Sequence, residues 1–204
     1  MIKLFKAMKN LHREEKGMTG LETAIILIAF VTVAAVFGYA VLSAGLFSAE
    51  RAKETIYAGL NEAKSNMELS GSVIGLGDNA TNPPTKLDKI KFTVKNAIAG
   101  NPIDMTPNSG ATAGDNKCVI SLTTSDTYLN NIAWSTHFIG DDNGNNLLET
   151  GEQCEVTIDV SALSLDSDLG ANLTFSVQVK PSLGSTITIQ RTLPPAIAQV
   201  MDLH

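Results

Sequence analysis

Apolar residues dominate one uninterrupted stretch near the start of the chain. Residues 21–47 read LETAIILIAFVTVAAVFGYAVLSAGLF, with Glu22 as the one charged side chain and no proline. As an α-helix at about 1.5 Å per residue this stretch would be roughly 40 Å long, enough to cross a hydrocarbon core of about 30 Å. Its apolar side chains surround the helix axis, so the helix requires burial on every side, in lipid or in a bundle of like helices.

Residues 48–69 are expected to continue the helix with a different pattern. An apolar residue recurs every three or four positions between charged ones, at Ala49, Ala52, Ile56, Ala63 and Met67. This spacing predicts an amphipathic helix whose apolar stripe covers either the outer domain or a neighbouring helix. We expect Gly71 to end the helix.

Beyond residue 70 the pattern changes to the alternation of apolar and polar residues that is typical of β-strands. The clear segments are 90–94, 118–122, 156–160, 173–179 and 186–191, and the weaker ones are 72–74 and 134–139. Glycine, asparagine and aspartate turns separate them, which predicts an antiparallel β-sandwich of immunoglobulin-like architecture. After Pro194-Pro195, residues 196–204 are expected to form a short tail. The predicted fold class is α+β, with a leader at 1–17, a long helix at 18–69 and an outer β domain at 70–204.

The residues before the apolar stretch indicate how it is used. Residues 1–17 carry five basic side chains against Glu14 and Glu15, a net charge of +3. A basic segment before an apolar one is typical of a secretory signal, but the attractive cleavage point, Lys16-Gly17, precedes the apolar stretch. Cleavage after Gly17 would leave the apolar helix at the mature N-terminus. The leader would stay cytoplasmic and the C-terminal part would face outward.

The run KGMTGLETAIILIAF, residues 16–30, resembles the class III signal of the archaeal flagellins (archaellins) and, more distantly, of type IV pilins. GSVIGLGDN at 71–79 and GNPIDMT at 100–106 also look like archaellin, so the likeness extends over much of the chain. The resemblance implies cleavage between Gly17 and Met18 by a membrane aspartic peptidase. It also implies a membrane-inserted precursor, a cytoplasmic assembly ATPase, and an extracellular filament made by this chain alone or with paralogous archaellins.

The same resemblance implies that the N-terminal helices form the filament core. The positions expected there are Gly20, Glu22, Ile25, Ile28, Val33, Val36, Gly38, Leu42 and Gly45. Glu22 would be the fifth residue of the mature chain, and a carboxylate at the edge of an apolar run is costly unless it is paired. The family offers a pairing with the amine of Met18 in a neighbouring subunit. The alternative is that Glu22 only reaches the lipid headgroups.

Charge and motifs narrow the function further. The formal net charge is −6, and removal of the +3 leader leaves −9, which excludes a nucleic-acid partner and suits a soluble external surface. The sequence has no G-x-S-x-G motif, no phosphate-binding glycine loop and no Cys/His pairing. We therefore predict that the protein is not an enzyme.

One loop has the spacing of a calcium site. Residues 141–152, DDNGNNLLETGE, place oxygen donors at the alternate positions of an EF-hand-type loop. The candidate ligands are Asp141, Asn143, Asn145, the backbone carbonyl of Leu147, Glu149 and Glu152. Asn146 stands where the pattern requires glycine, and no helices are expected to flank the loop. We expect weak calcium binding, with a solvated acidic turn between strands as the alternative.

The sequence also suggests two covalent modifications, a disulfide and N-linked glycans. Cys118 and Cys154 are the only cysteines, and on the outer side of a membrane they could form a disulfide; otherwise they are two separate small core residues. Asn79 and Asn172 each begin an Asn-x-Thr motif, the acceptor pattern for an N-linked glycan.

The sequence thus favours an archaellin, the structural subunit of a rotating motility filament. An archaeal adhesive pilin with the same helix is one alternative. A single-pass, membrane-anchored calcium-binding ectodomain that never polymerises is the other.

Overall fold

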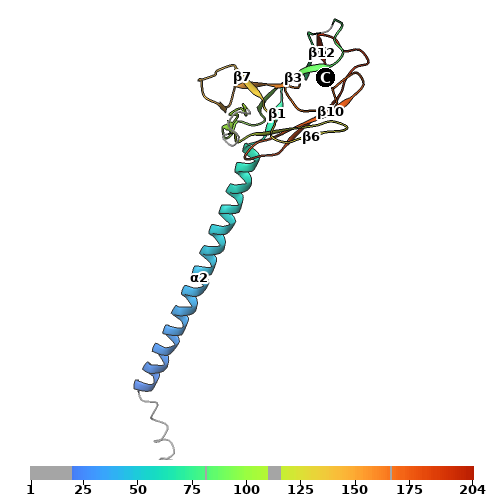
Figure 1. The fold of residues 1–204 in the computed structure, drawn as a ribbon. Coiled ribbons are helices and arrows are strands. Elements are labelled where there is room, and N and C mark those ends of the chain that lie inside the picture. Colours follow the sequence, from blue (N-terminus) through green and yellow to red (C-terminus); the bar gives the residue numbers. More distant parts are fainter. Residues whose placement is uncertain (1–19, 81, 110–115, 166) are drawn as a thin grey trace, which may run out of the picture. The chain divides into compact units, whose positions relative to one another are not determined.

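The computed structural model describes residues 20–80, 82–109, 116–165 and 167–204, which form one long helix followed by antiparallel β-sheets (Figure 1). This confirms the α+β class. The chain divides into two compact units, residues 1–56 and 57–204. The predicted leader and the Gly17–Met18 cleavage site lie outside the described residues.

Helix α2 runs from Gly20 to Lys64 and has 45 residues. The absence of proline and the abundance of alanine and leucine favour a continuous helix. Glu22 lies in the first turn and Lys64 in the last, so both charges complement the helix dipole.

The helix ends five residues before the predicted end at 69. Met67–Leu69 form strand β1, and Met67 is buried in the β core, so its predicted place on a helical stripe is wrong. The cause is a set of contacts with distant loops: the Asn66 carbonyl accepts a hydrogen bond from Ala97 N at 2.9 Å, and Asn66 Oδ1 accepts one from Ser185 N at 2.8 Å. These bonds tie Asn66 to segments outside the helix, and the chain continues into β1 at Met67.

Two glycines allow the loops to approach the end of the helix. A Cβ on Gly100 would collide with the Lys64 carbonyl, and a Cβ on Gly184, whose φ is 96°, would collide with the Ser65 carbonyl. Gly100 follows β3 (Leu87–Asn96), and Gly184 lies between β10 (Thr174–Lys180) and β11 (Ile187–Thr192). Two segments that belong to different sheets therefore hold the last turn of α2.

The first sheet has six strands in the order β12-β2-β3-β9-β7, with β1 also paired to β3. Its other strands are β2 (Ile74–Gly77), β7 (Ser135–Ile139), β9 (Gln153–Asp159) and β12 (Val200–Asp202). The second sheet has the order β11-β10-β5-β6, with β5 at Val119–Thr123 and β6 at Tyr128–Leu129. A small third sheet pairs β4 (Ile103–Asp104) with β8 (Leu147–Leu148).

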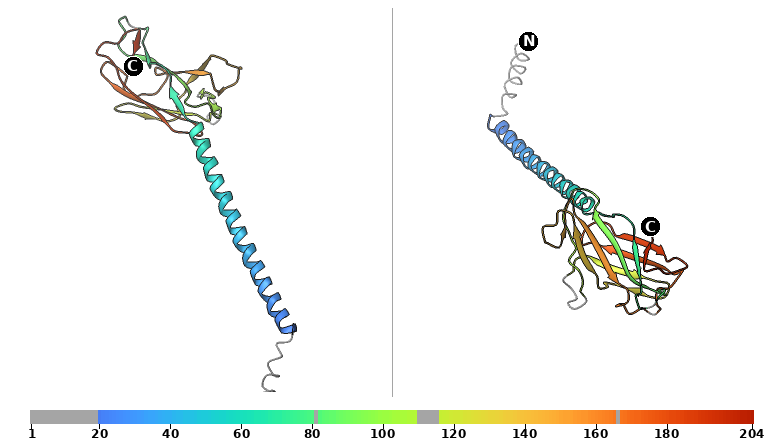
Figure 2. Two further views of the ribbon diagram at one scale, coloured as in Figure 1. Left: turned by 180° about the vertical axis from the view of Figure 1, so that it is seen from behind. Right: turned by 90° about the horizontal axis from the view of Figure 1, so that it is seen from above.

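The two main sheets share one core (Figure 2). In β3 the alternation is direct: Ile90, Phe92 and Val94 are buried, while Lys89 and Lys91 lie on the other side. From the second sheet, Leu122 and Val177 contribute to the same cluster. This is the two-layer packing that the alternating segments predicted. The specific likeness to immunoglobulin domains stays a prediction.

All five clear strand predictions correspond to observed strands, and 134–139 corresponds to β7. The prediction at 72–74 meets β2 at a single residue, Ile74. The predicted tail, 196–204, is wrong in part, because it contains β12 and buries Met201 and Leu203.

Candidate functional site on helix α2, with the loop and cysteine sites

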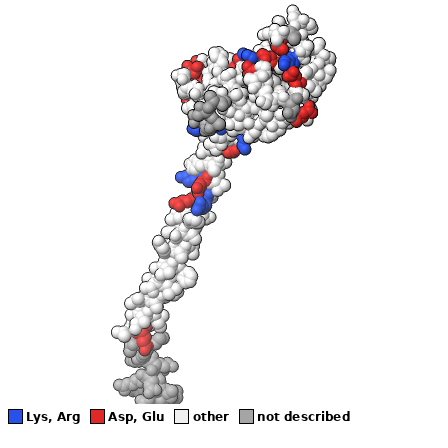
Figure 3. Space-filling view, in the orientation of Figure 1, with Lys and Arg blue, Asp and Glu red and all other residues white. Residues whose placement is uncertain are grey.

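The apolar part of α2 is uncovered along its whole length. No residue of the helix is buried. The fifteen large apolar side chains between Leu21 and Phe47 are each 54–76% exposed. Soluble monomers rarely expose apolar patches of more than a few hundred Å². In Figure 3 this part of the helix is white between the charge of its first turn and a band of charge further along.

The two threonine hydroxyls within the stretch form hydrogen bonds with the helix backbone. Thr23 Oγ1 donates to the Gly20 carbonyl at 3.2 Å, and Thr32 Oγ1 donates to the Ala29 carbonyl at 2.9 Å. Since each threonine has a partner in its own helix, an apolar environment can cover it at low cost.

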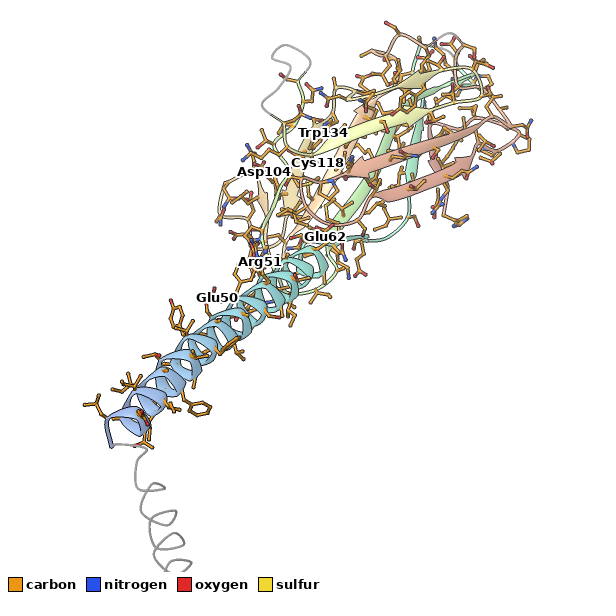
Figure 4. The ribbon with its side chains drawn as sticks, turned by 90° about the horizontal axis from the view of Figure 1, so that it is seen from below. Glu50, Arg51, Glu62, Asp104, Cys118 and Trp134 are labelled. Carbon is orange, nitrogen blue, oxygen red and sulfur yellow. The ribbon has the colours of Figure 1, made fainter. Side chains whose placement is uncertain are left out.

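A charged segment begins abruptly at Glu50 (Figure 4). The Arg51 guanidinium lies 5.2 Å from the centre of the Phe47 ring, and its Nη1 is 3.0 Å from Glu54 Oε2. Arg51 therefore joins the last aromatic residue of the apolar stretch to the first charged turn. This boundary marks where an apolar environment would have to end.

The nine residues predicted for the filament core all lie in α2 and are all exposed. For Gly20, Gly38 and Gly45, an added Cβ would meet no atom within 4 Å. The chain's own packing therefore does not require glycine at these positions. The stripe from Ala49 to Ala63 is also uncovered, with Ile56 69% exposed.

By length and composition, α2 is sufficient to cross a membrane. A signal sequence near an N-terminus has the same properties, so this observation does not by itself separate a permanent span from a transient one.

The side chains of the 141–152 loop are engaged with the loop's own backbone. Asn143 Oδ1 accepts from Asn145 N at 3.1 Å, and Asn145 Oδ1 accepts from Leu147 N at 2.6 Å. The buried Glu152 accepts from Glu149 N at 2.9 Å. These bonds join five of the six predicted calcium-ligand residues in one loop, while Asp141 is exposed.

The loop departs from the EF-hand pattern in its backbone. The residues with positive φ inside it are Gly144 at position 4, with φ 82°, and Gly151 at position 11, with φ 96°, not Asn146 at position 6. Leu147 belongs to β8 and pairs with Asp104. Among the described residues, no group of three or more His, Cys, Asp or Glu side chains is arranged to hold a metal ion. Calcium binding stays a prediction.

Cys118 and Cys154 lie on facing sheets, one immediately before β5 and the other in β9, and both are buried as free thiols. Burial raises the pKa of each to about 12. The proximity of Cys118 contributes to the raised pKa of Cys154. The disulfide stays a prediction, and the interpretation of the two cysteines as core residues agrees with their burial.

Both predicted glycan acceptors are accessible. Asn79 lies in an exposed turn, although Thr81 of its motif is outside the described residues. Asn172 is exposed and has a φ of 61°. Glycosylation at either residue stays a prediction.

Comparison with known proteins identifies the family. A sequence profile of archaeal-type flagellins matches residues 17–191 of this chain. The chain belongs to the archaeal-type flagellin family. Probable flagellin 1 and probable flagellin 2 of Archaeoglobus fulgidus are 36% and 34% identical to it over 201 residues, which cover 94% of this chain and 96% of each relative. The resemblance seen in the sequence is therefore confirmed.

Solved structures agree with this assignment. The archaeal flagellum of Methanospirillum hungatei is 27% identical, with a TM-score of 0.66, over 91% of this chain and 99% of that one. An archaeal flagellin crystal structure from Methanocaldococcus jannaschii matches 67% of this chain and 95% of its own with a TM-score of 0.55; at 16% identity it supports the fold alone.

This flagellin is thus a structural subunit of the archaeal flagellum, an extracellular filament, and not an enzyme. These matches favour the motility filament over the adhesive pilin and the monomeric ectodomain.

The loop prediction is testable with calcium and the isosteric pair Asp141→Asn and Glu149→Gln. We call residues 57–204 the β unit. We expect millimolar calcium to raise the melting temperature of the wild-type β unit by a few degrees, because ligand at about ten times Kd adds about 1.4 kcal/mol. The double variant should lose this response, while magnesium controls for ionic strength. An unchanged melting temperature at about 10 mM calcium would contradict the prediction.

The thiols predict a pH dependence that distinguishes the reduced protein from the disulfide. A buried thiol with a raised pKa keeps its proton while the unfolded chain releases it near pH 9, so stability falls as the pH rises from 9 towards 12. The reduced protein should lose about 2 kcal/mol per thiol between about pH 8 and pH 10.5 relative to the oxidised one. Chemical denaturation of both forms measures this. Mass spectrometry first confirms that the oxidised sample contains the disulfide. If the stability of the oxidised and reduced samples then had the same dependence on pH, the prediction would be refuted.

Proposed function

We propose that this flagellin is made as a membrane-inserted precursor, loses residues 1–17, and polymerises through α2 into the rotating core of the flagellar filament. The observation that carries the proposal is the complete exposure of the apolar residues of α2. Such a helix requires an apolar environment before assembly and another one after it.

The free energy of burying the apolar side chains shows how lipid and a helix bundle compare as environments for α2. Fifteen large apolar side chains at roughly 1.5–3 kcal/mol each correspond to about 20–45 kcal/mol against exposure to water, as an upper limit. Free subunits in water are therefore strongly disfavoured. Lipid is about as apolar as leucine, so transfer from the membrane into a helix bundle gains little from the hydrophobic effect.

Close packing between helices must then favour the assembled state, and α2 has small residues that allow such packing. Gly38 and Gly45 have open space around them, and small residues let helix backbones approach closely where lipid supplies no hydrophobic drive. The exposed stripe from Ala49 to Ala63 extends this surface into the charged segment. Because the transfer is nearly balanced, removal of subunits from the membrane requires an energised machine, for which the family resemblance implies a cytoplasmic ATPase.

Cleavage of the leader would create a positive charge that can pair with the Glu22 carboxylate. Cleavage by the membrane peptidase would place a positively charged amine on Met18, four residues before Glu22. In a bundle, that amine on one subunit can pair with Glu22 of a neighbour, so that neither charge is buried alone.

The assembly proposal is tested by a charge in the middle of the apolar stretch. We expect Val33→Asp or Val36→Asp to abolish filaments in electron micrographs and swimming in cells that carry the variant as their only copy. Both residues are exposed in α2, so the β unit should keep its melting temperature. Asn61→Asp, exposed near the charged end of the helix, is the matched control and should assemble. Normal filaments from the Val33 and Val36 variants would refute a filament core built from α2.

The pairing of Glu22 is tested by Glu22→Gln. Loss of the carboxylate should reduce filament yield by about tenfold or more, since one buried amine would remain unpaired. Mass spectrometry of the wild-type protein and of the Glu22→Gln variant should find Met18 as the first residue of each. This result separates an assembly defect from a processing defect. Equal filament yields, or a mature chain that begins elsewhere, would count against the pairing.

A further inference from the structure

The outward face of the second sheet carries almost no charge. In β10 the inward residues Phe175, Val177 and Val179 are buried, so the alternate residues lie on the opposite face. The register aligns them with outward residues of β5 and β11. We call the resulting set the neutral face; its members are Thr123, Thr174, Ser176, Gln178, Thr188, Gln190 and Thr192. Ser121 has the same orientation in the register but is buried. Lys180, at the end of β10, is the one charged outward residue among the described residues of these three strands.

The first sheet has the opposite character on its outward side. Lys91 Nζ lies 2.8 Å from Glu155 Oε1, and Lys95 Nζ lies 3.1 Å from Glu68 Oε1. Lys89 Nζ lies 3.7 Å from Asp159 Oδ2. A partner that covered this side would have to remove these ion pairs from water, which is costly.

The neutral face shares one compositional feature with protein interfaces. Charged residues are depleted at the core of an interface relative to the rest of the surface. Gln178, Thr188 and Gln190 are exposed, and Tyr128, opposite Thr123 at one margin, is 61% exposed. The β11 strand is also an edge of its sheet, so the face extends to an open margin.

Charge identifies the partner. The chain has a net charge of −6, and residues 18–204 carry −9, so two copies repel each other over most approaches. The neutral face is where two copies can meet with the least repulsion and the least desolvation of charge. Its hydroxyl and amide groups both donate and accept hydrogen bonds, and they can therefore be satisfied by the polar surface of another copy.

We propose that the neutral face is the surface through which the β unit contacts the β unit of a second copy of this chain in the filament. The proposal rests on polymerisation through α2, which brings copies together. In a filament the contact is heterologous, so the neutral face meets a different surface of its neighbour.

The test introduces charge without changing shape. Gln178→Glu with Gln190→Glu replaces two exposed amides by isosteric carboxylates on the neutral face. Gln153→Glu with Gln199→Glu makes the same change at exposed residues in β9 and next to β12, on the first sheet. Each double variant is expressed as the only copy, and filament length and yield are measured by electron microscopy. The melting temperature of each β unit confirms folding.

We expect filament yield or length to fall by about tenfold or more for the neutral-face variant, with the first-sheet variant unchanged. Gln178→Lys with Gln190→Lys should also impair assembly, because desolvation, not net repulsion, sets the cost. Normal filaments from the Glu and Lys neutral-face variants would overturn the proposal, as would an equal defect in the first-sheet control. If those variants assemble while Val33→Asp does not, polymerisation through α2 stands and the neutral-face contact falls.

Discussion

Water is the wrong environment for the first half of α2, and most other properties of the chain follow from that. The helix buries none of its residues, although the fifteen large apolar side chains from Leu21 to Phe47 would lose about 20–45 kcal/mol of stabilisation in water. The β unit forms its own core from a separate set of residues between Met67 and Leu203, and no residue of α2 is part of that core. The chain therefore combines a β unit that buries its own core with a helix whose apolar surface can be buried only by other molecules.

This division explains the distribution of charge. Apart from Glu22, charged side chains on the helix start at Glu50. They are frequent on the outward side of the first sheet, where lysines and carboxylates pair. The neutral face of the second sheet instead carries threonine, serine and glutamine. A polymer subunit needs both kinds of surface, because it must stay soluble towards the medium and still tolerate close neighbours.

The sequence was informative wherever local pattern decides the structure. The apolar run located α2, and the alternation in ITIQRT and TFSVQVK located two adjacent strands and also held the signal for the neutral face, whose polar positions are all uncharged. The likeness of residues 16–30 to the archaellin signal was sufficient to indicate the family. The end of α2 was not predictable in the same way. No glycine or proline interrupts residues 60–70, and the stop comes from Ala97 and Ser185, which are distant in the sequence.

The shortest strands were not predicted from the sequence, for a related reason. β4, β6 and β8 have two residues each, too few to show a period, and β12 lies in what looks like a tail after Pro194-Pro195. In the 141–152 loop the spacing of oxygen-bearing residues was visible in the sequence, but the backbone conformation was not. Positive φ falls at Gly144 and Gly151, and β8, which lies inside the loop, pairs with the distant strand β4.

The close approach of Gly100 and Gly184 to the last turn of α2 has a mechanical consequence. The Lys64 carbonyl meets a segment that follows β3, and the Ser65 carbonyl meets the connection between β10 and β11. Directly after that turn, Asn66 is hydrogen-bonded to both segments, through Ala97 N and Ser185 N, so tension applied there is shared between two sheets. A single tether peptide would concentrate the same load on one strand and peel it away bond by bond.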